Sequence, residues 1–343
     1  MELSFKPYSL EYKYPFGVSG NRRTHTPVVF TKLSIDGFTG YGEACLPPYL
    51  GETQESTLEF LEKAKKLLQK FSPKSSIEEI LKTVDALSKN NNAGKAAIDI
   101  ALHDLIGKIN NKPCYELFGF KKPDPKHTAC TIGIDEDENL LEKKINDAKD
   151  FGVLKIKAGT DDDKKLITTI RKYTDKPLFI DVNQGWKDKH FVVDMLRWLK
   201  VRGVFLVEQP MPANMLEEMA WVKQHNILPL IADENVKRLD DIEKIKDCFN
   251  GINIKLMKCT GLHEAKKMIE LAKKNNLKIF LGCMAESSCA TSAMAQLMDH
   301  GDFIDLDAPN LLKNDPFEGV EYKNGKIILG TGFGVSAKPK ISF

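Results

Sequence analysis

The chain has 343 residues, and its 50 basic and 48 acidic side chains leave a formal net charge of +2. This length allows one large domain, or a large domain with a smaller companion, around a substantial core. The near balance of charges argues against nucleic acid or an anionic membrane as the main partner.

Cysteine usage and the N-terminus indicate the compartment. The seven cysteines are scattered, form no C-x-x-C pair and mostly lie in apolar runs, which is typical of reduced core thiols. The N-terminus has no signal-peptide core, and no apolar run approaches the roughly 18 residues of a membrane-spanning helix. We therefore expect a cytoplasmic protein without nucleic acid or membrane partners.

The first 120 or so residues combine extended stretches with helical patterns. Residues 26–35 and 40–45 are extended and flank a turn at Asp36-Gly37, so we expect an antiparallel meander. Helices are then expected over residues 53–69, 76–88 and 92–109. Strands followed by helices predict an α+β domain over residues 1–122.

Strict alternation of strand and helix patterns follows, over residues 123–318. Eight apolar runs predict strands at residues 127–134, 153–157, 178–181, 204–208, 228–233, 252–255, 278–283 and 303–307. Amphipathic segments alternate with them, at residues 136–150, 161–174, 188–200, 214–225, 238–247, 261–275 and 287–299. Charged residues recur at successive strand ends, which favours a TIM-like (β/α) barrel over an open sheet with one switch point. The last segment, residues 319–343, contains a predicted hairpin at Asn324-Gly325 and is expected to return to the first domain.

Three of the strand ends carry carboxylates. Asp181, Glu208 and Asp233 follow one another at steps of 27 and 25 residues, so in a barrel they lie on neighbouring strands, about 5 Å apart. Converging carboxylates repel each other unless a cation joins them, and oxygen-only ligands favour Mg²⁺ over zinc. The alternative is that each acid caps the following helix, an explanation that weakens for three acids in phase.

Lysines stand before and after these acids. Lys155 and Lys157 are two residues apart on one strand and therefore share a face, whereas Lys255 ends a strand about three strands further round. A K-x-K pair is also common on exposed strands. If Lys155 and Lys157 point into the rim beside a divalent cation, repulsion and desolvation would lower their pKa and provide a neutral amine as a base. One lysine would then remove a proton next to a metal-bound carboxylate, and the opposite lysine would return a proton to the other face.

Five short strings at the strand ends have a distinctive order and spacing. They are Lys155-Ile156-Lys157, Asp181-Val182-Asn183, Glu208-Gln209-Pro210, Ala232-Asp233-Glu234 and Asn253-Ile254-Lys255-Leu256-Met257-Lys258. Together they resemble the enolase superfamily, in its muconate-lactonizing subgroup, and the resemblance covers essentially the whole chain. It implies a modified (β/α)7β barrel with an N-terminal α+β capping domain, and one Mg²⁺ per subunit. The implied metal ligands are Asp181, Glu208 and Asp233; the implied acid and base groups are Lys157 and Lys255, assisted by Lys155.

Two aspartates on the last predicted strand narrow the substrate class. Asp305 and Asp307 stand at i and i+2, and they resemble the D-x-D with which dipeptide epimerases hold the free ammonium group of the substrate. Cycloisomerases and succinylbenzoate synthases act on anions without an amine, which two such acids would repel. Capping of loops is the alternative role. Thr131 on the first strand and Cys283 at the end of the seventh are further candidates for substrate contact.

The leading hypothesis is a Mg²⁺-dependent dipeptide epimerase of the Ala-Glu or Ala-Ala type. It would invert the α-carbon of the C-terminal residue by a two-lysine 1,1-proton transfer through a metal-stabilised enolate. A muconate-type cycloisomerase or an o-succinylbenzoate synthase is the alternative within the fold. A Schiff-base aldolase with Lys157 or Lys255 as nucleophile, and a non-enzymatic binding protein, are more distant alternatives.

The expected partner is a small dipeptide, and homo-oligomers are common for barrels of this kind. Side-chain preference depends on flaps around residues 16–25 and 46–53. The sequence leaves two roles open for Arg22 and Arg23 in the first flap: contact with a substrate carboxylate over the rim, or an exposed basic turn.

Overall fold

A computed structural model describes residues 1–18, 21–72 and 75–342 of the chain. Its N-terminal part is an antiparallel meander of three strands: β1 (Glu2–Val18), β2 (Asn21–Ile35) and β3 (Phe38–Cys45). Asp36 and Gly37 both have positive φ, 49° and 82°, and form the predicted tight turn between β2 and β3. The predicted 16–25 flap consists of the last residues of β1 and the first residues of β2, and its residues 19–20 lie outside the described residues.

Helices cover one face of this sheet. They are α1 (Gln54–Leu68), α2 (Ile77–Asp85) and α3 (Asn92–Ile109), close to their predicted bounds, followed by the short α4 (Cys114–Leu117). Gly40 and Gly42 on β3 let α3 pack against the sheet backbone, because a Cβ at these positions would lie 2.1 and 2.0 Å from the carbonyls of Ala101 and Ala97. The close contact holds α3 between the sheet and the rest of the molecule.

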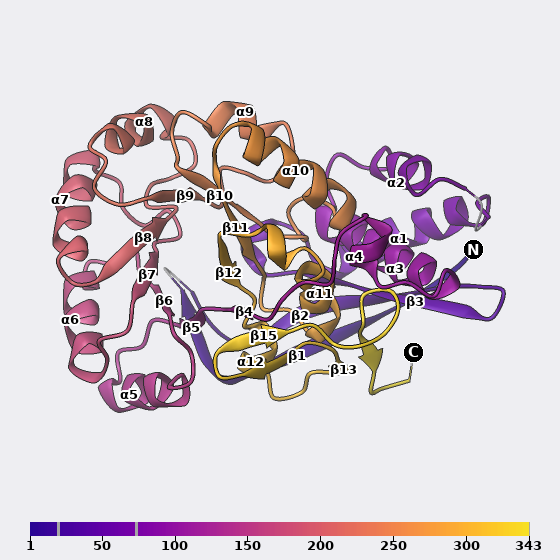
Figure 1. Cartoon of the computed structure of the whole chain (residues 1–343), viewed down its shortest axis with the longest axis horizontal. Coiled ribbons are helices and arrows are strands. Elements are labelled where there is room, and N and C mark those ends of the chain that lie inside the picture. Colours follow the sequence, from indigo (N-terminus) through magenta and orange to yellow (C-terminus); the bar gives the residue numbers. More distant parts are fainter. Residues whose placement is uncertain (19–20, 73–74, 343) are drawn as a thin grey trace.

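Eight parallel strands form the second part, in the spatial order β5 to β12. The strands are β5 (Cys130–Ile132), β6 (Leu154–Lys157), β7 (Leu178–Asp181), β8 (Val204–Glu208), β9 (Leu230–Ala232), β10 (Gly251–Ile254), β11 (Lys278–Gly282) and β12 (Phe303–Asp305). The connecting helices are α5 (Glu138–Asp147), α6 (Asp163–Tyr173), α7 (Lys189–Lys200), α8 (Leu216–Gln224), α9 (Asp241–Ile245), α10 (Leu262–Lys274) and α11 (Ser288–Ala295). In Figure 1 the helices α5 to α9 form an outer arc around the strands. The Ala129 amide donates to the Ile304 carbonyl at 3.0 Å and brings the two outer strands together, so the sheet is a nearly closed (β/α)7β barrel.

The predicted first barrel strand, residues 127–134, is wrong in its extent. Lys126–His127 forms a separate strand, β4, which pairs antiparallel with β15 (Lys326–Ile328), and the barrel strand begins only at Cys130. Thr128 separates the two, because its amide donates to the Gly325 carbonyl and its hydroxyl accepts from the Leu306 amide at 2.9 Å. The run 127–134 is divided because β4 pairs with the distant strand β15. A local sequence pattern does not reveal such a pairing.

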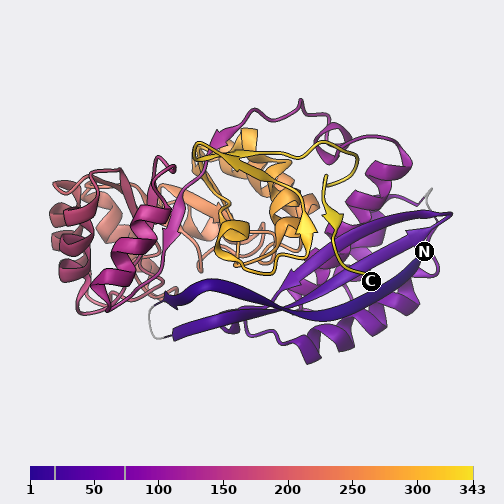
Figure 2. The ribbon, with the colours of Figure 1, turned by 90° about the horizontal axis from the view of Figure 1, so that it is seen from below.

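The part of the chain after β12, which includes the predicted segment 319–343, returns to the N-terminal sheet and helices. It contains the short helix α12 (Ala308–Leu311) and the strands β13 (Phe317–Glu318), β14 (Glu321–Lys323), β15 and β16 (Lys338–Pro339). Asn324 and Gly325 both have positive φ and form the predicted hairpin between β14 and β15. The Val335 amide donates to Asp104 on α3 at 3.0 Å, and Figure 2 shows this segment running back beside the long strands β1 and β2. The division at residues 122/123 and 318/319 stays a prediction.

Apolar side chains fill the barrel below its C-terminal end. One compact cluster consists of Ala129, Phe179, Leu206, Ile231 and Phe280, one from each of five strand segments. Among the described residues, no helix is both long and apolar enough to span a membrane. All seven cysteines are free thiols, and six of them are buried.

Candidate active site

The charged residues predicted at strand ends meet at the C-terminal rim of the barrel. Lys157, Asp181 and Glu208 are the last residues of β6, β7 and β8, and they stand beside one another in the sheet register. Asp233 and Lys255 directly follow β9 and β10. All five side chains belong to buried residues. The strand ends therefore bring together residues that are up to 98 positions apart, 157 to 255, in one site.

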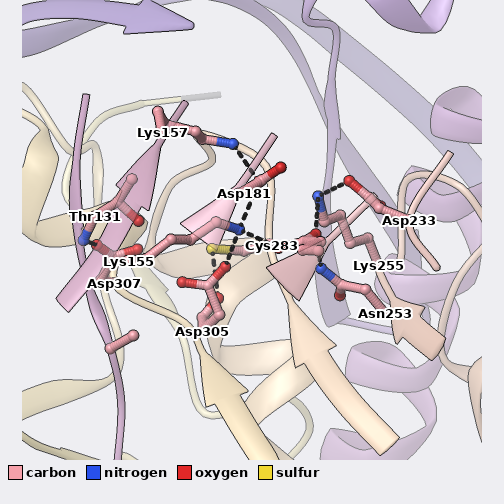
Figure 3. Close-up of polar contacts among 12 residues, drawn as sticks. Thr131, Lys155, Lys157, Asp181, Asp233, Asn253, Lys255, Cys283, Asp305 and Asp307 are labelled. Atoms are coloured by element: carbon pink, nitrogen blue, oxygen red, sulfur yellow. Dashed lines mark hydrogen bonds and ion pairs between the residues drawn. The ribbon is translucent and has the colours of Figure 1, made fainter. Parts of the chain in front are cut away.

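Two lysines face each other across this rim. The Lys157 ammonium donates to Asp181 Oδ2 at 2.6 Å and to Asn183 Oδ1 at 3.2 Å. The Lys255 ammonium donates to Asp233 Oδ2 at 2.7 Å. Figure 3 shows both amines turned toward the space between their strands, and both side chains line a cleft at the rim.

Lys155 lies deeper, at the centre of the carboxylates. Its ammonium is 2.7 Å from Asp305 Oδ2, 2.9 Å from Glu208 Oε2 and 3.0 Å from Asp181 Oδ2. The rings of Phe179 and Phe280 lie beneath it, with centroids 5.4 and 5.8 Å away. A buried cation thus holds three buried carboxylates in place.

Ion pairing decides the protonation of these groups. Burial lowers the pKa of Lys155, but attraction to Asp305, Glu208 and Asp181 outweighs it and raises that pKa well above the ordinary value. The pKa of Lys255 is raised well above the ordinary value by Asp233 and Glu208 in the same way. The carboxylates that surround these two ammonium groups therefore favour their charged form.

The pKa values of the carboxylates Asp181 and Glu208 shift in opposite directions. Burial raises the pKa of Asp181, but the ammonium groups of Lys157 and Lys155 overcome this effect and lower it below the ordinary value. The pKa of Glu208, in contrast, is raised to about 7, first by burial and then by repulsion from Asp181. Asp181 is therefore held in its ionised form, whereas Glu208 takes up a proton much more readily.

The donor set fits a hard cation such as Mg²⁺. Asp181, Glu208 and Asp233 offer only oxygen atoms. Glu208 Oε2 accepts no hydrogen bond of good geometry from any described residue, although Lys155 lies 2.9 Å away. The carboxylates nevertheless converge on lysines rather than on each other: residues 1–18, 21–72 and 75–342 contain no group of three His, Cys, Asp or Glu side chains placed to hold an ion. Ammonium groups thus occupy the positions next to the carboxylates that a cation would need.

Asp305 and Asp307 form a second acidic position in the cleft. Asp305 ends β12, whereas Asp307 lies beyond the strand and directly precedes α12, so the prediction of two carboxylates on one strand is wrong in detail. Both are buried, and both line the cleft. Asp307 Oδ2 accepts from the Thr131 amide at 2.6 Å, while Asp305 Oδ1 has no hydrogen-bond partner among the described residues. Burial, followed by repulsion from Asp305, raises the pKa of Asp307 to about 7.

Thr131 and Cys283 also line the cleft, as predicted. The Cys283 thiol donates to the Asp305 carbonyl at 3.2 Å, and burial raises the pKa of this thiol well above the ordinary value. Cys283 therefore contributes shape rather than a nucleophile.

The N-terminal part of the chain adds cleft residues that sequence reasoning did not assign. Phe16 and Arg23, from the β1–β2 hairpin, and Tyr49 close the cleft from above. Arg23 Nε and Nη1 are buried and have no hydrogen-bond partner in the described part of the chain, whereas the neighbouring Arg22 pairs with Asp135 at 3.4 Å. The Arg22-Arg23 string was the available signal, but it does not tell which arginine points inward.

Glu234 was also missed. It follows Asp233, lines the cleft, and its Oε1 accepts from Asn183 Nδ2 at 3.3 Å. Burial, followed by repulsion from Asp233, raises its pKa to about 8. The Ala232-Asp233-Glu234 string placed Glu234 beside the site, but a strand pattern alone does not show which of two adjacent acids faces the cleft.

Strained backbone supports the rim. Asn183, Gln184 and Gln209, which follow the carboxylates of β7 and β8, have φ values of 46°, 68° and 37°, unusual for residues other than glycine. The buried Gln209 side chain accepts from the Asp233 amide at 2.9 Å and donates to Asn235. It ties the loop after β8 to the loop after β9, so neighbouring carboxylates keep a fixed relation.

Two family models together match most of the chain. "Mandelate racemase / muconate lactonizing enzyme, N-terminal domain" matches residues 5–119, and "Enolase C-terminal domain-like" matches residues 140–341.

Individual relatives match nearly end to end. The L-Ala-D/L-Glu epimerase of Bacteroides thetaiotaomicron is 48% identical over 337 residues, 98% of this chain and 88% of that protein. A substrate-liganded complex of the L-Ala-D/L-Glu epimerase from Bacillus subtilis superposes with a TM-score of 0.92 at 26% identity, covering 98% of both chains. The dipeptide epimerase of Enterococcus faecalis V583, complexed with Mg and L-Leu-L-Tyr, superposes with a TM-score of 0.91 at 30% identity, also covering 98% of both chains.

Proposed function

Because the chain belongs to the mandelate racemase and muconate lactonizing enzyme family of the enolase superfamily, we propose that it is a Mg²⁺-dependent dipeptide epimerase. The reaction inverts the α-carbon of the C-terminal residue of a dipeptide. The observation that carries this proposal is the pair Lys157 and Lys255, whose amines border one cleft from opposite strands. A planar carbon between two amines can lose a proton on one face and gain one on the other.

Mg²⁺, held by Asp181, Glu208 and Asp233, would stabilise the negative charge that develops on the substrate carboxylate as the α-proton leaves. Lys157 and Lys255 exchange the proton with the two faces of the α-carbon. Each amine must be neutral when it accepts the proton. In the structure the ammonium of Lys157 pairs with Asp181 and that of Lys255 pairs with Asp233. When these carboxylates bind another cation instead, burial of the amines favours their neutral form. Lys155 keeps its three carboxylate contacts and supplies fixed positive charge near the substrate carboxylate.

Asp305 and Asp307 specify a substrate with a free amine. Two buried carboxyl groups at one end of the cleft leave an ammonium group as the matching ligand, and Asp305 Oδ1 has no other partner among the described residues. Substrates of cycloisomerases and succinylbenzoate synthases lack that amine and would be repelled. The dipeptide N-terminus therefore lies at Asp305 and Asp307, and the reacting carbon lies between the lysines.

Arg23 favours an acidic side chain on the C-terminal residue. Its guanidinium reaches the cleft from the N-terminal sheet, with two buried nitrogen atoms that lack a partner in the described residues. A carboxylate satisfies such a group in a bidentate manner. Together with the likeness to the L-Ala-D/L-Glu epimerase of B. thetaiotaomicron, this supports L-Ala-L-Glu and L-Ala-D-Glu as preferred substrates.

The test is isotope exchange. L-Ala-L-Glu incubated with the protein and Mg²⁺ in D₂O should incorporate one deuterium at the glutamate α-carbon, detected by mass spectrometry, while chiral chromatography detects L-Ala-D-Glu. A panel with Ala, Leu and Lys at the second position tests the preference for an acidic side chain. Absence of exchange across the whole panel would reject the epimerase proposal. Activity that survives EDTA, together with trapping by borohydride, would support the Schiff-base aldolase instead.

Two further expectations accompany the proposal. We propose one Mg²⁺ per subunit, which calorimetric titration measures, and a homo-oligomeric assembly, which light scattering measures. The cytoplasmic location predicted from the sequence stays a prediction.

A further inference from the structure

Lys258 is a buried lysine beside the site, and it takes no part in the proposed reaction. It lies in the turn between β10 and α10, three residues after Lys255, and is 5% exposed. Its ammonium donates to Asp233 Oδ1, to the Asp233 carbonyl at 2.7 Å and to the Asn253 carbonyl at 2.9 Å. An ammonium group has three N–H donors, so every donor of Lys258 is used within the protein.

Lys255 differs from Lys258 in this count. Its ammonium donates to Asp233 Oδ2 and lies 3.9 Å from Glu208 Oε1, with no further partner in the part of the chain that the structure describes. Lys255 lines the cleft, whereas Lys258 does not. Two lysines one turn apart thus hold opposite oxygens of one carboxylate: Lys255 keeps donors for a substrate, and Lys258 keeps none.

The backbone of Lys258 connects the site to the N-terminal helices. Its carbonyl accepts from Asn92 Nδ2 at 2.9 Å, and Asn92 is the first residue of α3. Glu52, in the segment that also carries the cleft residue Tyr49, accepts from the Asn92 and Ala93 amides at 2.7 and 3.1 Å. Hydrogen bonds that are joined through the residues Asn92 and Lys258 therefore connect the 46–53 flap and α3 to Asp233.

We propose that Lys258 is a positioning residue, which fixes the Asp233 carboxylate and couples its position to the flap through Asn92. The proposal rests on the proposed function, in which Asp233 binds Mg²⁺. The ammonium of Lys258 binds both Oδ1 and the backbone carbonyl of Asp233. The Asp233 carboxylate therefore cannot rotate, and its other oxygen stays directed toward the cleft. If Lys258 acted only as a positive charge, its removal would instead reduce repulsion of a cation and strengthen metal binding.

Lys258→Met removes the donors and the charge while keeping the chain length. We expect Mg²⁺ affinity, measured by calorimetry and by the Mg²⁺-dependent rise in Tm, to fall by about 10- to 100-fold. Asn92→Ala leaves the ammonium in place and cuts only the link to α3, so we expect a smaller loss of about fivefold. Both readouts are made without any dipeptide.

Lys95→Met is the matched control. Lys95 is a buried lysine on α3, 3% exposed, whose ammonium donates to the Ser88 carbonyl and pairs with Asp85. Its loss should leave Mg²⁺ affinity unchanged within about twofold, because its partners lie outside the site.

Unchanged or tighter Mg²⁺ binding in Lys258→Met would overturn the positioning role. If that variant does not fold, Asn92→Ala decides, since an affinity equal to wild type would remove the coupling to the flap. A wild-type protein that binds Mg²⁺ but epimerises no dipeptide would reject the proposed function alone and leave this test valid.

Discussion

The ammonium of Lys155 lies 2.7 Å from the carboxylate of Asp305, although 150 residues separate them in the chain. Asp305 belongs to the end of the cleft that fits the substrate amine, and the other partners of Lys155, Asp181 and Glu208, belong to the candidate metal site. One buried cation therefore sets the distance between the two ends of the substrate. Replacing it tests whether the two ends act as a unit.

Lys155→Met should abolish epimerisation and also destabilise the fold. The change leaves three buried carboxylates without their shared cation, which costs about 3–5 kcal/mol of unfolding free energy when one partner of a buried pair is removed. Urea unfolding and activity assays measure the two effects. Retention of both activity and stability would contradict the central role of this lysine.

Lys157→Ala and Lys255→Ala should separate the two halves of the reaction. Each variant should lose epimerisation by about 10²–10⁴-fold, the usual contribution of one acid–base group. Each should still exchange the α-proton of one dipeptide epimer in D₂O, and the two variants should differ in which epimer exchanges. If a single variant exchanges both epimers, the two-lysine assignment fails.

Asp305→Asn and Asp307→Asn should weaken binding of the free amine. A hydrogen bond to a charged group contributes about 1.5–3 kcal/mol, so kcat/KM for L-Ala-L-Glu should fall about 10- to 150-fold, mainly through KM. Asp307→Asn should leave fold stability nearly unaffected, because a neutral amide replaces a buried carboxyl whose pKa is raised, whereas Asp305→Asn should also lower the unfolding free energy, because it removes one carboxylate from the buried ammonium of Lys155. Steady-state kinetics and thermal unfolding check both points, and unchanged kinetics would favour a role in loop capping.

Gly185→Ala should disturb Lys157 without touching the substrate. A Cβ at Gly185 would lie 2.4 Å from Gly159 in the loop after β6, so that loop must move. Displacement of a reacting group by about 1 Å typically costs about 100-fold in rate, and kcat should fall accordingly. Gly152→Ala is the control, since the nearest atom to its added Cβ, on His127, is 3.8 Å away. Wild-type kcat in Gly185→Ala would show that the loop position is not critical.

Buried Glu43 predicts a pH dependence of stability. Burial raises its pKa from 4.5 to about 7, although it accepts hydrogen bonds from Ser287 and from the Ala290 amide at the start of α11. The folded state therefore binds more protons than the unfolded state between pH 4.5 and 7, so this group makes the unfolding free energy fall as pH rises through that window, by up to roughly 3 kcal/mol. Above pH 7 the effect is constant.

Glu43→Gln should remove this slope. Urea unfolding of wild type and variant from pH 4.5 to 8 gives the difference curve, and Glu59→Gln, on the exposed face of α1, serves as the control. A difference curve that is flat between pH 4.5 and 7 would show that Glu43 titrates alike in both states.

Much of the fold followed from local pattern. Continuous apolar runs located nearly all barrel strands, and period-3.6 hydrophobicity located the helices, within a few residues, because parallel strands are buried on both faces whereas a helix buries one face. The run 127–134 was wrongly predicted as one strand, since its first residue belongs to β4, which pairs with β15 about 200 residues later. Pairing over such a distance leaves no local trace.

The sequence by itself determined which residues stand at strand ends and the order of their charges, because parallel strands in a barrel all deliver their last residue to one rim. Only the tertiary structure decided that Arg23 rather than Arg22 enters the cleft, and that Lys255 keeps free donors while Lys258 has none. It also decided the directions of the pKa shifts of Lys155 and Lys255, which the surrounding carboxylates raise. Periodicity fixes the side of an element that a residue occupies, whereas partners, distances and burial depend on the packing of segments far apart in the chain.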